Sequence, residues 1–122
     1  MIQSRYDKRH NVAIIEFSGR VDKAQAEEHY SRIEQIVPQD VRSFKILTDF
    51  SGVQTMDLEI QDIIKKVMDY FNERGVTEIL RVIPDPAQDI GFNIMSAFHY
   101  SKGVKILTLE SRQEALARLL KK

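Results

Sequence analysis

The sequence predicts an α/β domain with a mixed, mostly parallel sheet of four to five strands, an N-terminal antiparallel hairpin and about four helices. Two observations predict it. Apolar runs of strand length alternate with segments whose apolar residues recur every three or four positions, which is typical of amphipathic helices. A short polar turn joins the first two strand-like runs, whereas helix-length segments separate the later ones and therefore require parallel crossovers. All 122 residues, 1–122, are expected to form one domain.

The chain begins with two strand-like runs that predict a hairpin. Ile2–Tyr6 predicts a short edge strand, and Val12–Phe17 is an almost continuously apolar run of strand length. Ser18 and Gly19 follow the second run and are expected to end it, because both residues favour turns.

The first helix is predicted to begin after Asp22, a good N-cap residue. Gln25 stands three residues later, which is the spacing of a capping box. The helix is expected to stop before Pro38, which cannot continue it. Its apolar stripe consists of Ala26, Tyr30, Ile33 and Val37.

Phe44–Phe50 predicts the next strand, which Ser51 and Gly52 are expected to end. Phe-Ser-Gly also closes the preceding strand, which favours one kind of turn used twice over an internal repeat. Leu58–Arg74 has the apolar spacing of a helix packed on a sheet, and Gly75 is its expected C-cap.

The C-terminal part repeats the alternation of strand and helix. Glu78–Ile83 predicts a strand, Ala87–Tyr100 a helix, and Val104–Leu109 the last strand. Ser111 is expected to cap a final helix, with Glu114 at the capping-box position.

Composition excludes several classes of function. Eighteen basic and eighteen acidic residues cancel, which disfavours a nucleic-acid partner. The chain has no cysteine, its three histidines lack zinc-ligand spacing, and it contains no phosphate-binding or dinucleotide motif. No apolar run approaches the roughly 20 residues of a membrane span, and the N-terminus does not look like a signal peptide. We therefore expect a cytoplasmic, non-enzymatic protein with no metal and no cofactor.

Polar residues gather where the Phe44–Phe50 strand leads into the next helix. Asp57 is expected to cap that helix, and its dipole favours the negative charge of Asp57 and of Glu59. Asp49 is expected to stabilise the end of the strand. Turn or cap roles are expected for Ser51 and Thr55, of which Thr55 is the first candidate for modification.

The order and spacing of four segments resemble those of the STAS domain. This domain occurs in anti-sigma-factor antagonists and in the cytoplasmic tails of sulfate transporters. Gly19–Asp22 is similar to the family's Gly-x-Leu-Asp signature. Phe44–Asp57 is similar to its hydrophobic strand followed by Asp, Leu, Ser/Gly, Gly, Val, two or three residues and Asp. Gly75–Leu80 matches its glycine and strand, and Leu109–Leu116 its closing strand and helix. The resemblance covers nearly the whole chain and implies a domain that works by binding.

The sequence departs from the family at its switch. The family has Asp-Ser-Ser-Gly-Leu there, and a kinase phosphorylates the second serine, whereas this chain has Glu59 at that position and Ile60 in place of the glycine. The resemblance implies a partner of the anti-sigma factor or kinase type, or a second copy of the chain. Glu59 would act as a fixed substitute for phosphoserine, although capping alone also explains the carboxylates. The expected partner-binding residues are Gly52, Val53, Thr55, Asp57, Leu58 and Glu59.

A SpoIIAA-like branch of the superfamily, related to lipid-carrying CRAL-TRIO folds, also lacks the serine. The aromatic run Gly91–Tyr100 resembles that branch, and implies a lipid or other apolar ligand as an alternative function. A broad buried face explains this helix equally well. The residues expected to form an apolar ligand surface or a homodimer contact are Phe92, Met95 and Tyr100.

Overall fold

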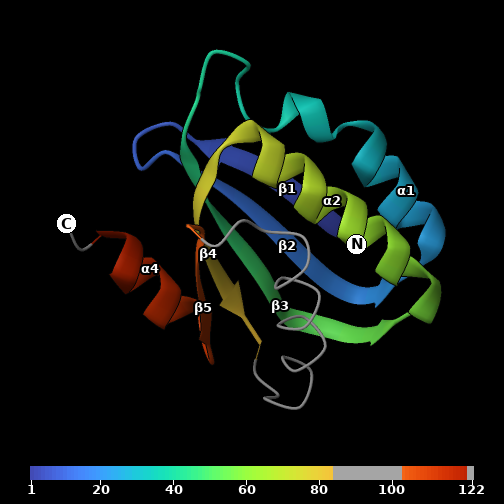
Figure 1. The fold of residues 1–122 in the computed structure, drawn as a ribbon. Helices are drawn as coiled ribbons and strands as arrows, with labels where there is room; N and C mark the ends of the chain where they lie inside the picture. The colour runs from blue at the N-terminus through green and yellow to red at the C-terminus, as the bar shows by residue number, and fades with distance from the viewer. Residues whose placement is uncertain (84–102, 121–122) are drawn as a thin grey trace.

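The computed structural model describes residues 1–83 and 103–120 (Figure 1). Its strands are β1 (Ile2–Asp7), β2 (Val12–Val21), β3 (Phe44–Met56), β4 (Val76–Val82) and β5 (Lys105–Leu109). Within these ranges the α-helices are α1 (Lys23–Ser31), α2 (Gln61–Arg74) and α4 (Arg112–Leu120), and short 3₁₀ helices are η1 (Ile33–Gln35) and η2 (Leu58–Ile60). The predicted helix Ala87–Tyr100 lies outside the described residues.

The five strands form one sheet in the order β1-β2-β3-β4-β5. β1 pairs antiparallel with β2, and every other neighbouring pair is parallel. The mixed sheet with an N-terminal hairpin, predicted from the spacing of apolar runs, is confirmed.

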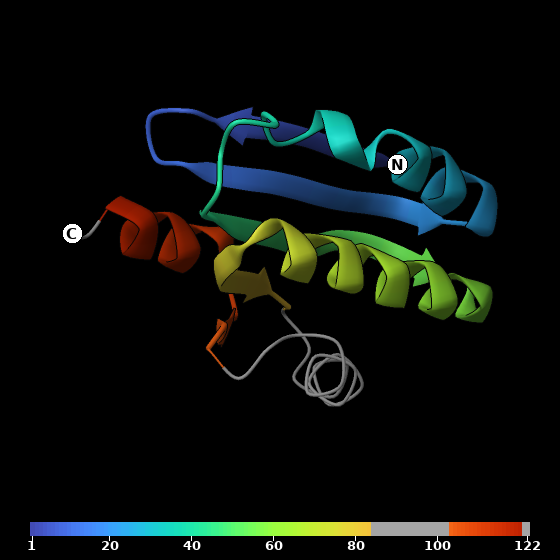
Figure 2. The same cartoon turned by 45° about the horizontal axis from the view of Figure 1, so that its top comes forward.

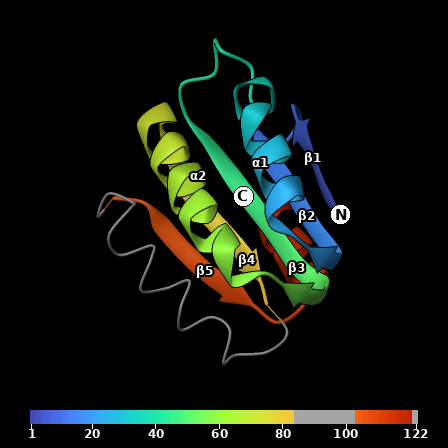
Figure 3. The ribbon, with the colours of Figure 1, turned by 90° about the vertical axis from the view of Figure 1, so that its right-hand side faces the viewer.

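Both faces of the sheet are covered. Figure 3 shows α1 and α2 side by side in front of the sheet, with α4 behind it. The face under α1 and α2 buries alternate residues of the strands, such as Ala13, Ile15, Ile46 and Ile79, against Phe71 of α2. The opposite face packs against α4, and its core comprises Val12, Ile14, Leu47, Leu80, Val82, Ala115 and Leu119. Residues that face α1 and α2 thus alternate along each strand with residues that face α4, as the pleat of a strand requires.

The turn of the hairpin is held by its own side chains. The Tyr6 hydroxyl donates to Oδ1 of Asn11 at 2.5 Å, and Asn11 adopts a positive φ of 54°. Nδ1 of His10 lies 2.9 Å from Oδ2 of Asp7. This hydrogen bond is the main reason that the pKa of Asp7 lies below its ordinary value.

Helix α1 begins as predicted but ends early. Oδ1 of Asp22 accepts a hydrogen bond from the backbone N–H of Gln25 at 2.8 Å. The reciprocal bond of a capping box is missing, because Oε1 of Gln25 is buried with no partner among the described residues. The α-helix stops at Ser31 rather than before Pro38, and the Ser31 hydroxyl donates to the carbonyl of Glu28 at 2.6 Å. Such bonds between a side chain and a nearby carbonyl compete with the backbone hydrogen bonds of the helix and favour the early end of α1.

The predicted strand ends at the two Phe-Ser-Gly sequences are wrong. β2 and β3 continue to Val21 and Met56, and Ser18 lies beside Gly52 in their register. The rings of Phe17 and Phe50 stack with centroids 4.7 Å apart. The two sequences therefore lie beside each other on neighbouring strands and are not two turns. Because both strands are long, they carry the starts of α1 and α2 to the same end of the sheet (Figure 2).

Helix α2 ends at Gly75, as predicted. Gly75 has a left-handed φ of 99°, and its N–H reaches the carbonyls of Phe71 and Asn72. Arg74 fixes the neighbouring loop, since its guanidinium donates to the carbonyls of Pro38 and Val41 at 3.0 and 3.3 Å.

The remaining predicted elements differ from the structure by one or two residues at their ends. β4 begins two residues before Glu78 and ends one before Ile83, and β5 begins one after Val104. The hydroxyl of Ser111 accepts from the N–H of Glu114 at 3.2 Å, which confirms the predicted cap of α4.

Candidate functional site

The expected partner-binding segment is not a loop. Its first residues continue β3, which pairs with β2 as far as Met56 opposite Val21. Only Asp57 separates this strand from η2. The structure therefore places Gly52, Val53 and Thr55 on β3, Asp57 at the junction, and Leu58 and Glu59 in η2.

The β3 residues of this segment serve the contact between strands. A Cβ atom on Gly52 would lie 3.1 Å from Cβ of Ser18, so a larger side chain would push β2 and β3 apart. Val53 is half-buried against a small core formed by Val21, Ala26, Ile60 and Ile63. Packing therefore accounts for both positions, and the exposed chemistry lies further along the chain.

Asp57 is not the N-cap of α2, so that prediction is wrong. The capping position is Ile60, which makes no side-chain hydrogen bond. The N–H of Asp57 instead donates to the carbonyl of Val21 at 3.0 Å and prolongs the pairing of the strands. Its carbonyl accepts from Ile60 at 3.2 Å, and its carboxylate lies 3.9 Å from the guanidinium of Arg20. The 3₁₀ turn between strand and helix moves the helix start away from the carboxylate.

Glu59 is exposed in η2, immediately before α2. Among the described residues its side chain makes no hydrogen bond or ion pair. It borders a groove of about 650 Å³ between α1 and α2. The residues that line the groove are Lys23, Glu27, Tyr30, Glu59, Asp62, Ile63 and Lys66.

This α1–α2 groove carries an uneven distribution of charge. Two lysines and three acidic residues give it a net charge of −1. Lys23 lies 3.7 Å from Glu27 on the same helix, so these two charges compensate each other. Glu59 and Asp62 lie together at the start of α2, where the helix dipole favours negative charge. This end of the groove is therefore suited to a basic partner.

Sequence reasoning missed the contribution of α1. Lys23, Glu27 and Tyr30 lie beside Glu59 only because α1 and α2 pack next to each other. Only Ala26 and His29 of α1 are buried, and Lys23 and Glu27 are exposed polar residues that no periodic pattern singles out. The parallel order of strands was the available signal, since it places the starts of both helices at one end of the sheet.

A second cluster surrounds Asp49 on the α4 face. Asp49 is 5% exposed, and its Oδ1 accepts from the N–H and the hydroxyl of Ser51 at 2.9 and 2.6 Å. NH1 of Arg112 lies 3.5 Å from its Oδ2 and 2.9 Å from Oε1 of Glu16. The expected local bonds of Asp49 are present, but they lie within β3 rather than at its end.

Three further predictions concern an apolar surface, membrane spans and metal ligands. Phe92, Met95 and Tyr100, the expected apolar surface, lie outside the described residues. Over residues 1–83 and 103–120, no helix is long and apolar enough to span a membrane. Over the same ranges, no three His, Asp or Glu side chains are grouped to hold a metal ion.

Comparison with solved structures identifies the arrangement. Unphosphorylated SpoIIAA, an anti-sigma factor antagonist, matches with a TM-score of 0.67 and 16% identity over 100% of both chains. The chain has the SpoIIAA-like fold. Phosphorylated SpoIIAA from Bacillus matches with a TM-score of 0.65 and 16% identity, over 98% of this chain and 99% of that one. The sequence matches no protein-family model and no curated protein.

A third solved structure has the same SpoIIAA-like fold. It is an uncharacterised DUF3478-family protein from Shewanella loihica PV-4, with a TM-score of 0.71 and 12% identity over 98% of this chain and 92% of that one. The fold predicted from the STAS resemblance is therefore confirmed. At these identities the likeness concerns the fold, and the role of Glu59 depends on the local geometry.

Proposed function

We propose that this protein is a regulatory interaction module that works by binding rather than catalysis. Its partner is a protein of the anti-sigma factor or kinase type, or a second copy of the chain. The docking surface consists of Glu59, Asp62 and the α1 side of the groove, Lys23, Glu27 and Tyr30. The observation that carries the proposal is the exposed Glu59 without a side-chain partner among the described residues, on the rim of a groove in a SpoIIAA-like fold.

In this proposal Glu59 supplies a permanent negative charge. Glu59 would stand where anti-sigma-factor antagonists carry the phosphorylated serine, as the sequence resemblance implies, and a carboxylate offers no hydroxyl to a kinase. Phosphoserine carries about −1.5 to −2 charges against one for glutamate, so the substitute is partial. The dipole of α2 favours either group at this end of the helix. The module would thus stay in one binding state, in the cytoplasm, without a phosphorylation cycle.

The test compares two charge reversals, one in η2 just before α2 and one near the other end of α2. Glu59→Lys places a cation in the docking surface, whereas Glu73→Lys does so on an exposed position roughly 20 Å further along the chain at 1.5 Å per residue. Tagged wild type and both variants are used to capture partners from the extract of the source organism. Each captured protein is then purified, and its Kd for all three forms is measured by calorimetry. We expect Glu59→Lys to weaken binding by about tenfold or more, because like charges meet at the interface.

The same variants give the result that would overturn the proposal. Equal affinity for wild type and Glu59→Lys, with both proteins folded, would exclude Glu59 from the interface. A self-association lost in Glu59→Lys, measured by analytical ultracentrifugation, would identify a second copy as the partner. Glu59→Ser adds a direct test of the phosphoserine substitute, since it should give the partner preference of an unphosphorylated antagonist.

A further inference from the structure

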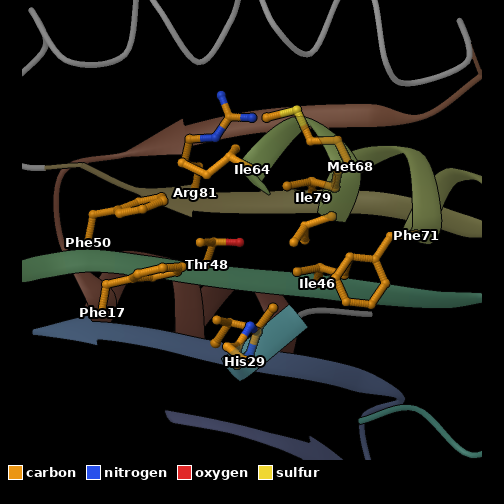
Figure 4. Close-up of a pocket in the computed structure, with 12 residues that line it drawn as sticks. Phe17, His29, Ile46, Thr48, Phe50, Ile64, Met68, Phe71, Ile79 and Arg81 are labelled. Atoms are coloured by element: carbon orange, nitrogen blue, oxygen red, sulfur yellow. The ribbon is translucent and has the colours of Figure 1, made fainter. Parts of the chain in front are cut away.

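A cavity of about 60 Å³ lies between the sheet and the two helices α1 and α2 (Figure 4). Its walls are mainly apolar. The stacked rings of Phe17 and Phe50 lie on one side, and Ile46 and Ile79 line the sheet beneath it. Met68 contributes from α2. The cavity shares no lining residue with the groove of the docking surface.

One polar atom of this cavity has no partner. His29, on α1, is 5% exposed, and its Nε2 is buried without a hydrogen bond among the described residues. Thr48 of β3 and Arg81 of β4 also line the cavity. A buried nitrogen that has left water and found no partner loses hydrogen-bonding free energy. The position of Nε2 therefore points to a missing hydrogen-bonding group inside the cavity.

The protonation state of His29 determines which chemical group can pair with its Nε2. Burial, and to a smaller extent the charge of Arg32, hold the pKa of His29 below its ordinary value, so the ring is neutral at neutral pH. A neutral imidazole presents Nε2 either as a donor or as an acceptor, depending on its tautomer. A hydroxyl group both donates and accepts, so it pairs with either form. The hydroxyl of Thr48 and the guanidinium of Arg81 are the other polar side-chain groups among the lining residues.

The volume limits the size of the occupant. An apolar cavity of about 150 Å³ holds benzene. A space of about 60 Å³ is less than half of that volume, so an aromatic ring does not fit inside it. We propose that this cavity binds a small neutral molecule with a hydroxyl group on an apolar body of very few carbons, and that the hydroxyl pairs with Nε2 of His29. This proposal does not depend on the docking surface.

Ethanol is the probe, and methyl groups on both faces of the sheet report its position. The protein is labelled with ¹³C at isoleucine and methionine methyls, and NMR spectra are recorded as ethanol is added. Saturable shifts are expected at Ile46, Ile79 and Met68, which line the cavity, and none at Ile14 on the α4 face. With three heavy atoms, ethanol should bind no more tightly than about 1 mM.

The role of the hydroxyl is tested with a variant and a second probe. His29→Leu should weaken ethanol binding by about three- to tenfold, the usual value of one hydrogen bond, and should leave the binding of xenon intact. In the wild type the ¹⁵N shift of His29 Nε2 should move with ethanol, which tests the contact without a substitution. Equal ethanol affinity in His29→Leu would overturn the proposal. So would the absence of saturable cavity shifts, or a resident water on Nε2 that ethanol does not displace.

Discussion

Gly75 is the position where a single methyl group should damage this fold most clearly. It ends α2 with a φ of 99°, a conformation that residues with a Cβ rarely adopt. A Cβ atom there would overlap the backbone carbonyl oxygen of Arg42. That contact is with backbone, so a rotation of a side chain cannot relieve it. Gly75→Ala therefore combines backbone strain with a steric overlap.

The two costs can be estimated separately. Left-handed backbone costs about 1–2 kcal/mol for a residue with a side chain. An overlap inside packed structure costs a further ~1–3 kcal/mol. The segment that would have to move is held from both sides, because Arg74 bonds to Val41 and the side chain of Asn11 donates to the carbonyl of Ser43 at 2.8 Å. We expect a total loss of about 2–5 kcal/mol, or about 10–20 °C in Tm for a domain of this size.

Two other glycines serve as matched controls in the same thermal unfolding assay. Gly19 has a positive φ of 64° but no atom within 4 Å of its Cβ position, so Gly19→Ala should show the backbone cost alone. Gly103 has no positive φ and no atom of the described residues within 4 Å of its Cβ position, and Gly103→Ala should be neutral or stabilising by up to about 1 kcal/mol. Circular dichroism should thus rank the melting temperatures Gly103→Ala, Gly19→Ala, Gly75→Ala, from highest to lowest. Equal Tm values for the Gly19 and Gly75 variants would refute the steric argument.

Three other substitutions test separate contacts. Arg112→Ala should lower the free energy of unfolding in urea by about 1–3 kcal/mol, because the buried Asp49 loses its cation; an unchanged midpoint would contradict this. Asp22→Ala should cost about 1 kcal/mol by removing the cap of α1, and unchanged helix stability would argue against the cap. The lowered pKa of His29 means that the unfolded chain binds more protons there, so stability should fall as pH drops below 6.5. His29→Leu should remove that part of the pH profile, and an identical profile would contradict the assignment.

The succession of elements was predictable because the periodicity of apolar residues reports local burial directly. The strip Ile60, Ile63, Met68 and Phe71 is buried as its spacing requires. The ends of β2 and β3 were not predictable in the same way. Ser and Gly favour turns in isolation, but here the two Ser-Gly pairs lie next to each other in parallel strands, where Gly52 allows a close approach to Ser18. Pairing between strands outweighed the local preference.

The candidate site shows a similar division. The exposed carboxylate of Glu59 could be found from the sequence, since it follows a strand and precedes an amphipathic helix. The role of Asp57 could not, because capping rules depend on the residue at which the helix begins and a 3₁₀ turn shifts that residue. Nor could the burial of His29, because histidine is polar and was not part of the apolar stripe expected for this helix.

The geometry now separates two roles that the sequence left open for the carboxylates. Since Ile60 occupies the capping position and Glu59 makes no side-chain bond among the described residues, the contribution of Glu59 to folding should be limited to the helix dipole. Glu59→Lys should therefore cost no more than about 1 kcal/mol in urea unfolding. Glu73→Lys, at the opposite end of α2 where the dipole favours a cation, should cost less. A large loss in Glu59→Lys would mean that the residue supports the fold, and a defect in partner binding could then no longer be assigned to the docking surface. A small loss would leave binding as the role of this charge.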